Sequence, residues 1–240
     1  TGTPPSLLRL SDAAIVARAD ALRRGPIRVA ILAGDDAAHA DAAVTAVDRW
    51  ALREGARSCP AAAEGAPAKP GTYAVVTDDG TSEAYVAANV AQGDEPAATA
   101  LADALDGSGG LLERALGDGL ARAYGARVLG PRGARALVVH VDAPEGALDA
   151  AVAQVRALFD RIRQGAFAAA DLARATKRAE SAREARMRDP RARLVALFRG
   201  DPAEASPSLE RVRSAAAAML RDDALVIVAA RPRRTPGGSP

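Results

Sequence analysis

The chain of 240 residues carries 32 Lys and Arg against 30 Asp and Glu, so its charge alone does not indicate a nucleic-acid binder. A single cysteine, Cys59, excludes an internal disulfide and a C-x-x-C metal site. No apolar run approaches the roughly 18 residues of a membrane-spanning helix, so we expect no membrane span. Richness in alanine and arginine with few lysines is typical of a high-GC bacterium. Because Thr1 is not a start methionine, the sequence is compatible with an exported or periplasmic protein that lost an N-terminal segment, and it leaves the compartment unknown.

Residues 1–54 are predicted to form a helix–strand–helix appendage, the tail of a preceding domain. Ser11–Arg24 begins with a capping serine and has apolar residues at helical spacing. The apolar run Ile27–Ala33 predicts a buried strand, and Asp36–Glu54 has the apolar stripe of a second helix. Residues 55–71 are rich in Ala, Pro and Gly without periodicity, which predicts a linker.

The main domain is predicted at residues 72–230. It begins with two strands, Thr72–Thr77 and Glu83–Ala91, joined by a turn in which Gly80 can adopt a positive φ. Two helices and a second hairpin follow, over Asp94–Leu105, Leu111–Leu116, Arg122–Leu129 and Ala134–Asp142.

The C-terminal part of this domain is predicted to be mainly helical. After Pro144 an apolar stripe recurs at helical spacing, formed by Leu148, Val152, Val155, Phe159 and Ile162, and Gly165 is expected to end that helix. Three more helices and a buried strand are expected, over residues 168–187, 190–198, 209–220 and 224–230. Residues 231–240 are predicted to be a disordered tail. The pattern favours an α+β fold, a mixed or antiparallel sheet with helices packed on one face.

Three segments in this order resemble the insulinase-like zinc metallopeptidases, the pitrilysin and mitochondrial-processing-peptidase type. GSGGLLERALGDGLARAYGARV (107–128) resembles the family's glycine-rich helix end, Leu-rich short helix and tyrosine-bearing strand. Pro144–Leu172 resembles a family helix followed by glycine and an acidic-Leu pair, and Leu209–Ala230 resembles the closing helix and strand. The resemblance implies a metallopeptidase-like fold, in a family that pairs a catalytic domain with a related non-catalytic one.

The catalytic domain of that family carries H-x-x-E-H, in which two histidines bind zinc and the glutamate activates water. This chain has two histidines: His39 is followed by ADAAV and His140 by VDAPE, so neither begins such a motif. We therefore expect no catalytic residue, no metal ligand and no cofactor in this chain. The resemblance then implies the C-terminal non-catalytic domain, with zinc held by another domain or by a partner subunit.

The resemblance also suggests substrate-binding residues. The family's non-catalytic domain directs a tyrosine and an arginine toward the substrate, and Tyr124 stands at the place of that tyrosine. Gly117 stands where the arginine is expected, and the neighbouring arginines are Arg114 and Arg122. Tyr124, Arg122 and Arg114 are therefore the candidate substrate-binding residues, although a strand tyrosine with its hydroxyl at the surface is the commoner reading for Tyr124.

Other chemical readings are weaker. His140 and Asp142 share one strand face, but such a pair near a strand end is ordinary. Eight Lys and Arg in Arg174–Arg193 could face nucleic acid, yet no aromatic side chain interleaves them, and a solvated helix face is the simpler interpretation. Gly107–Gly110 lacks the lysine of a phosphate loop.

Three functional hypotheses remain open. The first is a non-catalytic domain that helps hold a peptide against a zinc-bearing peptidase domain or subunit, with strand addition to a sheet edge as one mode. The second is a structural or scaffold domain with no peptidase role. The third, weaker, is a nucleic-acid-binding module that uses Arg174–Arg193. Whether the chain has any enzyme activity, and whether it forms a homodimer, is not decided by the sequence.

Overall fold

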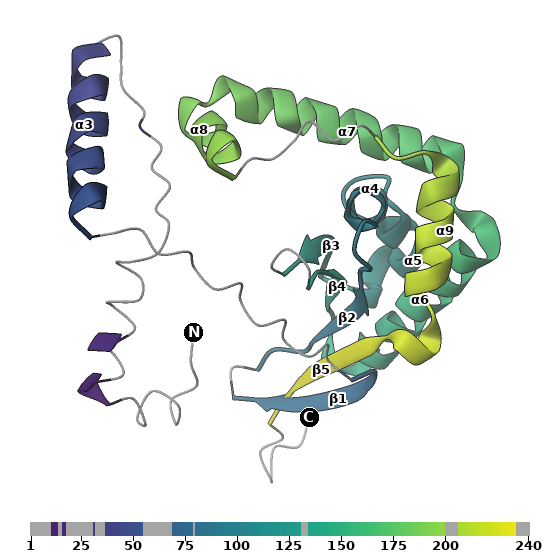
Figure 1. The fold of residues 1–240 in the computed structure, drawn as a ribbon. Coiled ribbons are helices and arrows are strands. Elements are labelled where there is room, and N and C mark those ends of the chain that lie inside the picture. The colour runs from purple at the N-terminus through teal and green to yellow at the C-terminus, as the bar shows by residue number, and fades with distance from the viewer. Residues whose placement is uncertain are drawn as a thin grey trace. The chain divides into compact units, whose positions relative to one another are not determined.

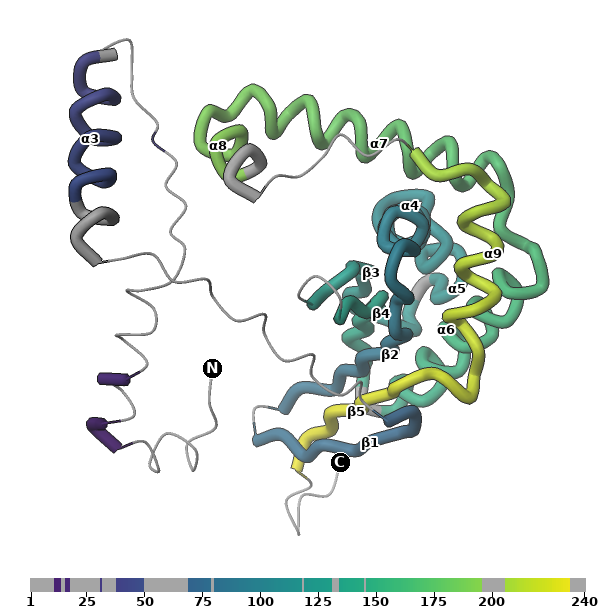
Figure 2. Tube along the Cα trace, in the orientation of Figure 1, coloured from purple at the N-terminus to yellow at the C-terminus, as the bar shows by residue number. Residues whose placement is uncertain are grey.

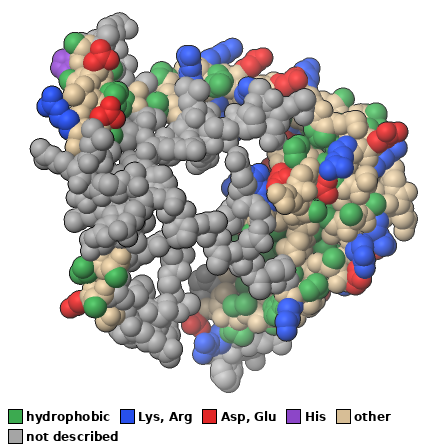
Figure 3. Space-filling model, viewed as in Figure 1, with side chains coloured by type: hydrophobic (Ala, Val, Ile, Leu, Met, Phe, Trp, Pro, Cys, Tyr) green, Lys and Arg blue, Asp and Glu red, His purple; other side chains and the backbone are tan. Residues whose placement is uncertain are grey.

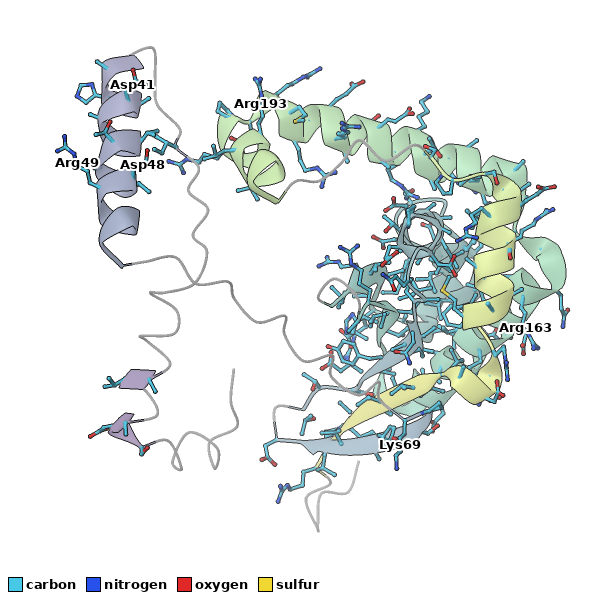
Figure 4. The ribbon with its side chains drawn as sticks, viewed as in Figure 1. Asp41, Asp48, Arg49, Lys69, Arg163 and Arg193 are labelled. Atoms are coloured by element: carbon cyan, nitrogen blue, oxygen red, sulfur yellow. The ribbon has the colours of Figure 1, made fainter. Side chains whose placement is uncertain are left out.

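The computed structural model describes residues 11–13, 16–17, 31, 37–54, 69–78, 80–130, 134–199 and 206–233. The chain divides into two compact units, residues 1–63 with 185–202 and residues 64–184 with 203–240 (Figure 1). In the first unit, α3 (Ala37–Glu54) confirms the predicted helix, and Figure 4 shows Asp41, Asp48 and Arg49 along it. Of the predicted helix 11–24 only residues 11–13, 16 and 17 are described, and all of these except residue 11 are helical. The predicted strand 27–33 lies outside the described residues except for Ile31.

The described residues of the second unit form one five-stranded mixed sheet. Its strands are β1 (Gly71–Thr77), β2 (Glu83–Asn89), β3 (Ala123–Leu129), β4 (Ala136–Asp142) and β5 (Val226–Pro232). Their order is β1-β5-β2-β4-β3. Only the β1–β5 pair is parallel, and the other three pairs are antiparallel. β5, the last of these strands along the chain, therefore lies between β1 and β2.

Helices pack on one face of this sheet, as Figures 1 and 2 show. Helices α4 (Glu95–Leu105) and α6 (Leu148–Arg161) pack directly on the strands. α5 (Leu111–Leu120) packs against both of these helices, and α9 (Leu209–Met219) packs against α4 and against η2 (Ile162–Ala166), the π-helical continuation of α6. α7 (Ala169–Arg188) is mostly exposed, and of its side chains only Asp171 and Ala175 are buried. The predicted short helix 190–198 is α8 (Pro190–Arg199), which falls in the first unit. The core lies between sheet and helices, and its largest fully buried side chains include Phe159, Phe167, Leu101, Leu137 and Leu148. The predicted α+β fold with helices on one face is confirmed.

The alternation of side chains along the central strands explains this layering. In β4, Leu137, Val139 and Val141 are buried beneath the helices, while Val138 and His140 are only half-buried on the opposite face. β2 shows the same alternation. Because a strand has a period of two residues, one face of the sheet is buried beneath the helices, and no helix among the described residues covers the other face. We call this second surface the open face.

Helix ends also follow the sequence. Along α6, four of the five predicted stripe residues are buried and Val152 is partly buried. Gly165 has φ 96°, so it ends this helix in a left-handed conformation as predicted. At the start of α9, the Ser208 side chain accepts a hydrogen bond from the Arg211 N–H at 3.2 Å, which caps the first turn.

Three strand predictions are wrong. Residues 72–77 and 83–91 do not form a hairpin, because β5 separates β1 from β2. β1 begins at Gly71, which the sequence placed in the linker, and the rest of that linker is described only at residues 69 and 70. β5 continues through Arg231 and Pro232, which the sequence placed in the disordered tail. Parallel pairing with β1 supplies backbone partners that hold these two residues extended.

Among the described helices, none combines the length and apolar character needed to cross a membrane. Figure 3 shows basic and acidic side chains interspersed on the visible face of the second unit, with apolar ones between them.

Candidate functional site

Tyr124 lies on β3 and shares its strand face with buried Ala126, so it points toward the helices and not to the open face. Its ring packs, half-buried, against the core. Burial, and then the nearby carboxylates of Glu113 and Asp106, raise the pKa of the Tyr124 hydroxyl above its ordinary value. Its hydroxyl makes no hydrogen bond to any residue in the described ranges, so it can still bond to water or a ligand.

The two candidate arginines are each held by a carboxylate. Arg122 donates from Nε at 3.1 Å and from Nη2 at 2.8 Å to Asp142 Oδ1, and its Nη2 also reaches the carbonyl of Ala143. Arg114 donates from Nη2 to Asp171 Oδ1 at 2.7 Å, which ties α5 to the start of α7. The structure therefore gives each of them an internal partner and does not gather the three candidates into one cluster. Their role toward a substrate stays a prediction.

A polar cluster on the open face joins β2 to β4. Register places Tyr85 opposite His140, and their ring centroids lie 4.9 Å apart. Both side chains converge on one carboxylate: His140 Nε2 lies 2.9 Å from Glu83 Oε2, and the Tyr85 hydroxyl donates to the same oxygen at 3.1 Å. Burial, and then this hydrogen bond, raise the pKa of the Tyr85 hydroxyl.

Sequence reasoning missed Glu83 and Tyr85, and the companion that it considered for His140, without predicting a functional pair, was Asp142. In the structure Asp142 is engaged by Arg122, and the partner of His140 comes from the neighbouring strand. The available signal was the spacing of Glu83 and Tyr85, which places both on one face of a strand. The pairing of β2 with β4, which places Glu83 and Tyr85 beside His140, could not be predicted from the local sequence.

The outer edge of the sheet is formed by β1. Its residues 71–76 are all exposed, and Tyr73, Val75 and Val76 present large apolar surfaces at 45%, 45% and 62% exposure. The Gly71 N–H bonds to the Leu225 carbonyl at 2.9 Å, and the Thr77 carbonyl accepts from the Arg233 N–H at 2.8 Å. In a parallel ladder, alternate residues make both backbone bonds to the same neighbour, so residues 71, 73, 75 and 77 bond to β5. Thr72, Ala74 and Val76 therefore direct their N–H and C=O groups away from β5, to an edge that pairs with no strand among the described residues.

Comparison with known proteins identifies the fold. No protein-family model matches this sequence, and no curated protein matches it. Among solved structures, the M16 peptidase inactive domain from Pseudomonas fluorescens matches with a TM-score of 0.69 at 15% identity over 97% of this chain. An M16-like peptidase from Alicyclobacillus acidocaldarius matches with the same TM-score at 17% identity over 97% of this chain. The inactive domain of a zinc protease from Bordetella parapertussis matches at 20% identity, over 69% of this chain and 98% of its own, with a TM-score of 0.55.

The chain has the fold of inactive M16 peptidase domains. This confirms the structural part of the resemblance to the insulinase-like family, and the identities between 15% and 20% show the fold alone. The M16-like chain spans 60% of the length of each of the first two matched structures. The activity of a whole M16 peptidase therefore belongs to a proposal and not to this comparison.

The M16-like fold raises the question of zinc. His140 lies on β4 with Glu83 as its partner, and His39 lies on α3 in the other unit. Within the described ranges, no three His, Cys, Asp or Glu side chains are grouped so that they could hold a metal ion. A catalytic zinc site uses three protein ligands, and the residues that the structure describes do not form such a group.

Proposed function

We propose that this M16-like chain is a non-catalytic domain of an insulinase-like zinc peptidase. It helps hold a peptide substrate against a zinc-bearing domain or partner subunit. Two facts support this: the fold is that of inactive M16 domains, and neither histidine begins an H-x-x-E-H motif. A zinc-bearing partner would supply the chemistry, and this chain would supply binding surface.

The observation that carries the binding role is the free edge of β1. An extended peptide can add there as a further strand, because Thr72, Ala74 and Val76 offer backbone donors and acceptors that no described strand uses. Apolar side chains flank those groups on both faces of the strand, with Tyr73 and Val75 on one and Val76 on the other. Backbone pairing would hold peptides of many sequences, and these side chains would favour apolar residues.

The test uses a fluorescent extended peptide and the full chain, with binding followed by anisotropy. The Val76→Pro variant removes one outward N–H and leaves the bonds to β5 in place, so we expect at least tenfold weaker binding. The Val76→Thr variant keeps that N–H and the β-branched shape, and we expect binding within about threefold of the parent chain.

Two N-methylated versions of the peptide provide the second arm. Methylation of one alternate set of peptide nitrogens should abolish binding, and methylation of the other set should leave it intact, because only one set faces β1. Equal binding of both versions, or no loss in Val76→Pro, would contradict strand addition. Absence of any peptide affinity would favour the scaffold alternative.

The nucleic-acid alternative loses support from the structure. Arg174 is tied to Asp171, and Arg178 donates to the backbone carbonyls of Asp103 and Asp106. Of the eight basic residues in the run 174–193, Arg174 is thus paired within α7, and Arg178 holds α7 to the end of α4.

A further inference from the structure

Tyr73 is an exposed aromatic residue on the open face, at the β1 edge of the sheet. Its side chain is 45% exposed. Register places Tyr73 opposite Val228 of β5, and Val228 is in turn opposite Tyr85 of β2. Because directly opposed residues point to the same face of a sheet, these three side chains form one row across the open face. Among the described residues Tyr73 ends that row, beside the edge to which a peptide strand would add.

Two contacts hold the Tyr73 ring in place. Its hydroxyl donates a hydrogen bond to the backbone carbonyl of Lys69 at 2.9 Å, and Figure 4 shows Lys69 beside β1. The ring also lies back over Gly71, which has no side chain, so that a Cβ built on Gly71 would be 3.8 Å from Cε2 of the ring. A ring that is already fixed loses little conformational entropy when a ligand packs on it.

The residues that surround this ring on the open face are apolar. Register places Val226, Val228 and Ala230 of β5 behind the edge strand, and Val75 follows Tyr73 on the same face of β1. Both valines of β5 are half-buried, so they leave some apolar surface exposed. A charged peptide side chain on this face would lose water without gaining an ion-pair partner from these residues, whereas an apolar one would bury carbon surface.

The pairing geometry brings one peptide side chain close to Tyr73. Tyr73 directs its backbone groups to β5, so in an added antiparallel strand it would face its partner as a non-hydrogen-bonded pair. In such pairs the two Cα atoms are about 4.5 Å apart, closer than in hydrogen-bonded pairs, and the side chains are in contact. An aromatic side chain at that position can pack on the Tyr73 ring, and aromatic pairs contribute more than the area they bury.

We infer that Tyr73 makes the β1 edge selective for peptides that carry an aromatic residue. The aromatic side chain packs on the Tyr73 ring on the open face, and the peptide runs antiparallel to β1. This inference rests on the proposed peptide-holding role, because it assigns side-chain specificity to that same edge. The peptide residues before and after the aromatic one point to the other face of the sheet and take no part in this preference.

Binding of three fluorescent peptides to the full chain, followed by anisotropy, tests the inference. The peptides share one threonine-rich extended sequence and differ at a single central position, which is Phe, Leu or Thr. We expect the Phe peptide to bind about fivefold more tightly than the Thr peptide, with the Leu peptide between them, because Leu gains burial without an aromatic pair.

Two substitutions at Tyr73 separate the ring from its hydrogen bond. Tyr73→Thr removes the ring and keeps a strand-forming residue, so the Phe and Thr peptides should bind within twofold of each other. The Thr peptide itself should bind this variant within about twofold of its affinity for the parent chain, which shows that the edge is intact. Tyr73→Phe keeps the ring and should retain at least a threefold preference for the Phe peptide. Tyr85→Thr is the matched control and should leave the preference unchanged, because β5 separates Tyr85 from the edge.

The outcomes distinguish this inference from the proposed function. If the Phe and Thr peptides bind the parent chain equally, or if Tyr73→Thr keeps the preference, aromatic selection is overturned while strand addition stands. If Tyr85→Thr removes the preference as fully as Tyr73→Thr does, the assignment to the edge tyrosine is overturned. If none of the three peptides binds, the peptide-holding role fails and this inference fails with it.

Discussion

At the scale of single residues, Asp171 is a buried carboxylate that connects two helices of the second unit. Its side chain is only 7% exposed, and it accepts hydrogen bonds from Arg114, Arg174 and the Ala168 N–H. These bonds join α5 to the first turn of α7, where a carboxylate also complements the helix dipole. The sequence indicated an acidic-Leu pair at this point but could not show that Arg114, 57 residues away, would be its partner.

The Asp171→Ala variant should lower the free energy of unfolding by about 2 kcal/mol, because it removes a buried acceptor that serves three donors. The two arginines are half-exposed and can hydrate, so the loss stays below that of a fully buried pair. Urea unfolding measures this loss. Asp160→Ala removes an exposed pair within α6 and should change stability by at most about 0.5 kcal/mol. Equal effects of the two variants would contradict a structural role for Asp171.

At the scale of elements, the local sequence pattern predicted most helices and strands. Which strands pair with one another depends on residues that are far apart in the sequence. The apolar stripe of α6 and the alternation of buried and half-buried side chains in β4 were both predicted, because periodicities of 3.6 and 2 residues are visible in a short stretch of sequence. The order of the sheet was not, because β5 enters it more than 130 residues after β2. The polar cluster of Glu83, Tyr85 and His140 was missed for the same reason, since it depends on which strands are neighbours.

The end of α6 offers a clean test of backbone conformation. Gly165 has φ 96°, and a Cβ built on it would meet no atom within 4 Å, so Gly165→Ala is opposed by conformation alone. We expect a loss of about 1 kcal/mol in the free energy of unfolding. Gly146 has equally open space and no positive φ, and Gly146→Ala should leave stability unchanged or raise it slightly. If Gly165→Ala left the free energy of unfolding unchanged, the turn after α6 would not require a residue in the left-handed conformation.

At the scale of the whole molecule, the order of elements carried the fold prediction. The glycine-ended helix, short helix, tyrosine-bearing strand, long helices and closing strand follow one another as in inactive M16 domains, and the structural matches confirm that fold. Candidate functional residues were harder to predict, because a binding surface such as the β1 edge exists only once the strands are assembled. The proposed role follows from the whole chain: an M16-like fold, an available sheet edge, and no sequence motif for catalytic zinc.

The zinc content of the purified 240-residue chain tests this account most directly. The chain is incubated with excess zinc, desalted and analysed for metal, and hydrolysis of a peptide mixture is followed on the same sample. The account predicts zinc well below one equivalent per chain and no hydrolysis above the rate in buffer. About one zinc per chain, with hydrolysis that a chelator abolishes, would contradict the non-catalytic assignment.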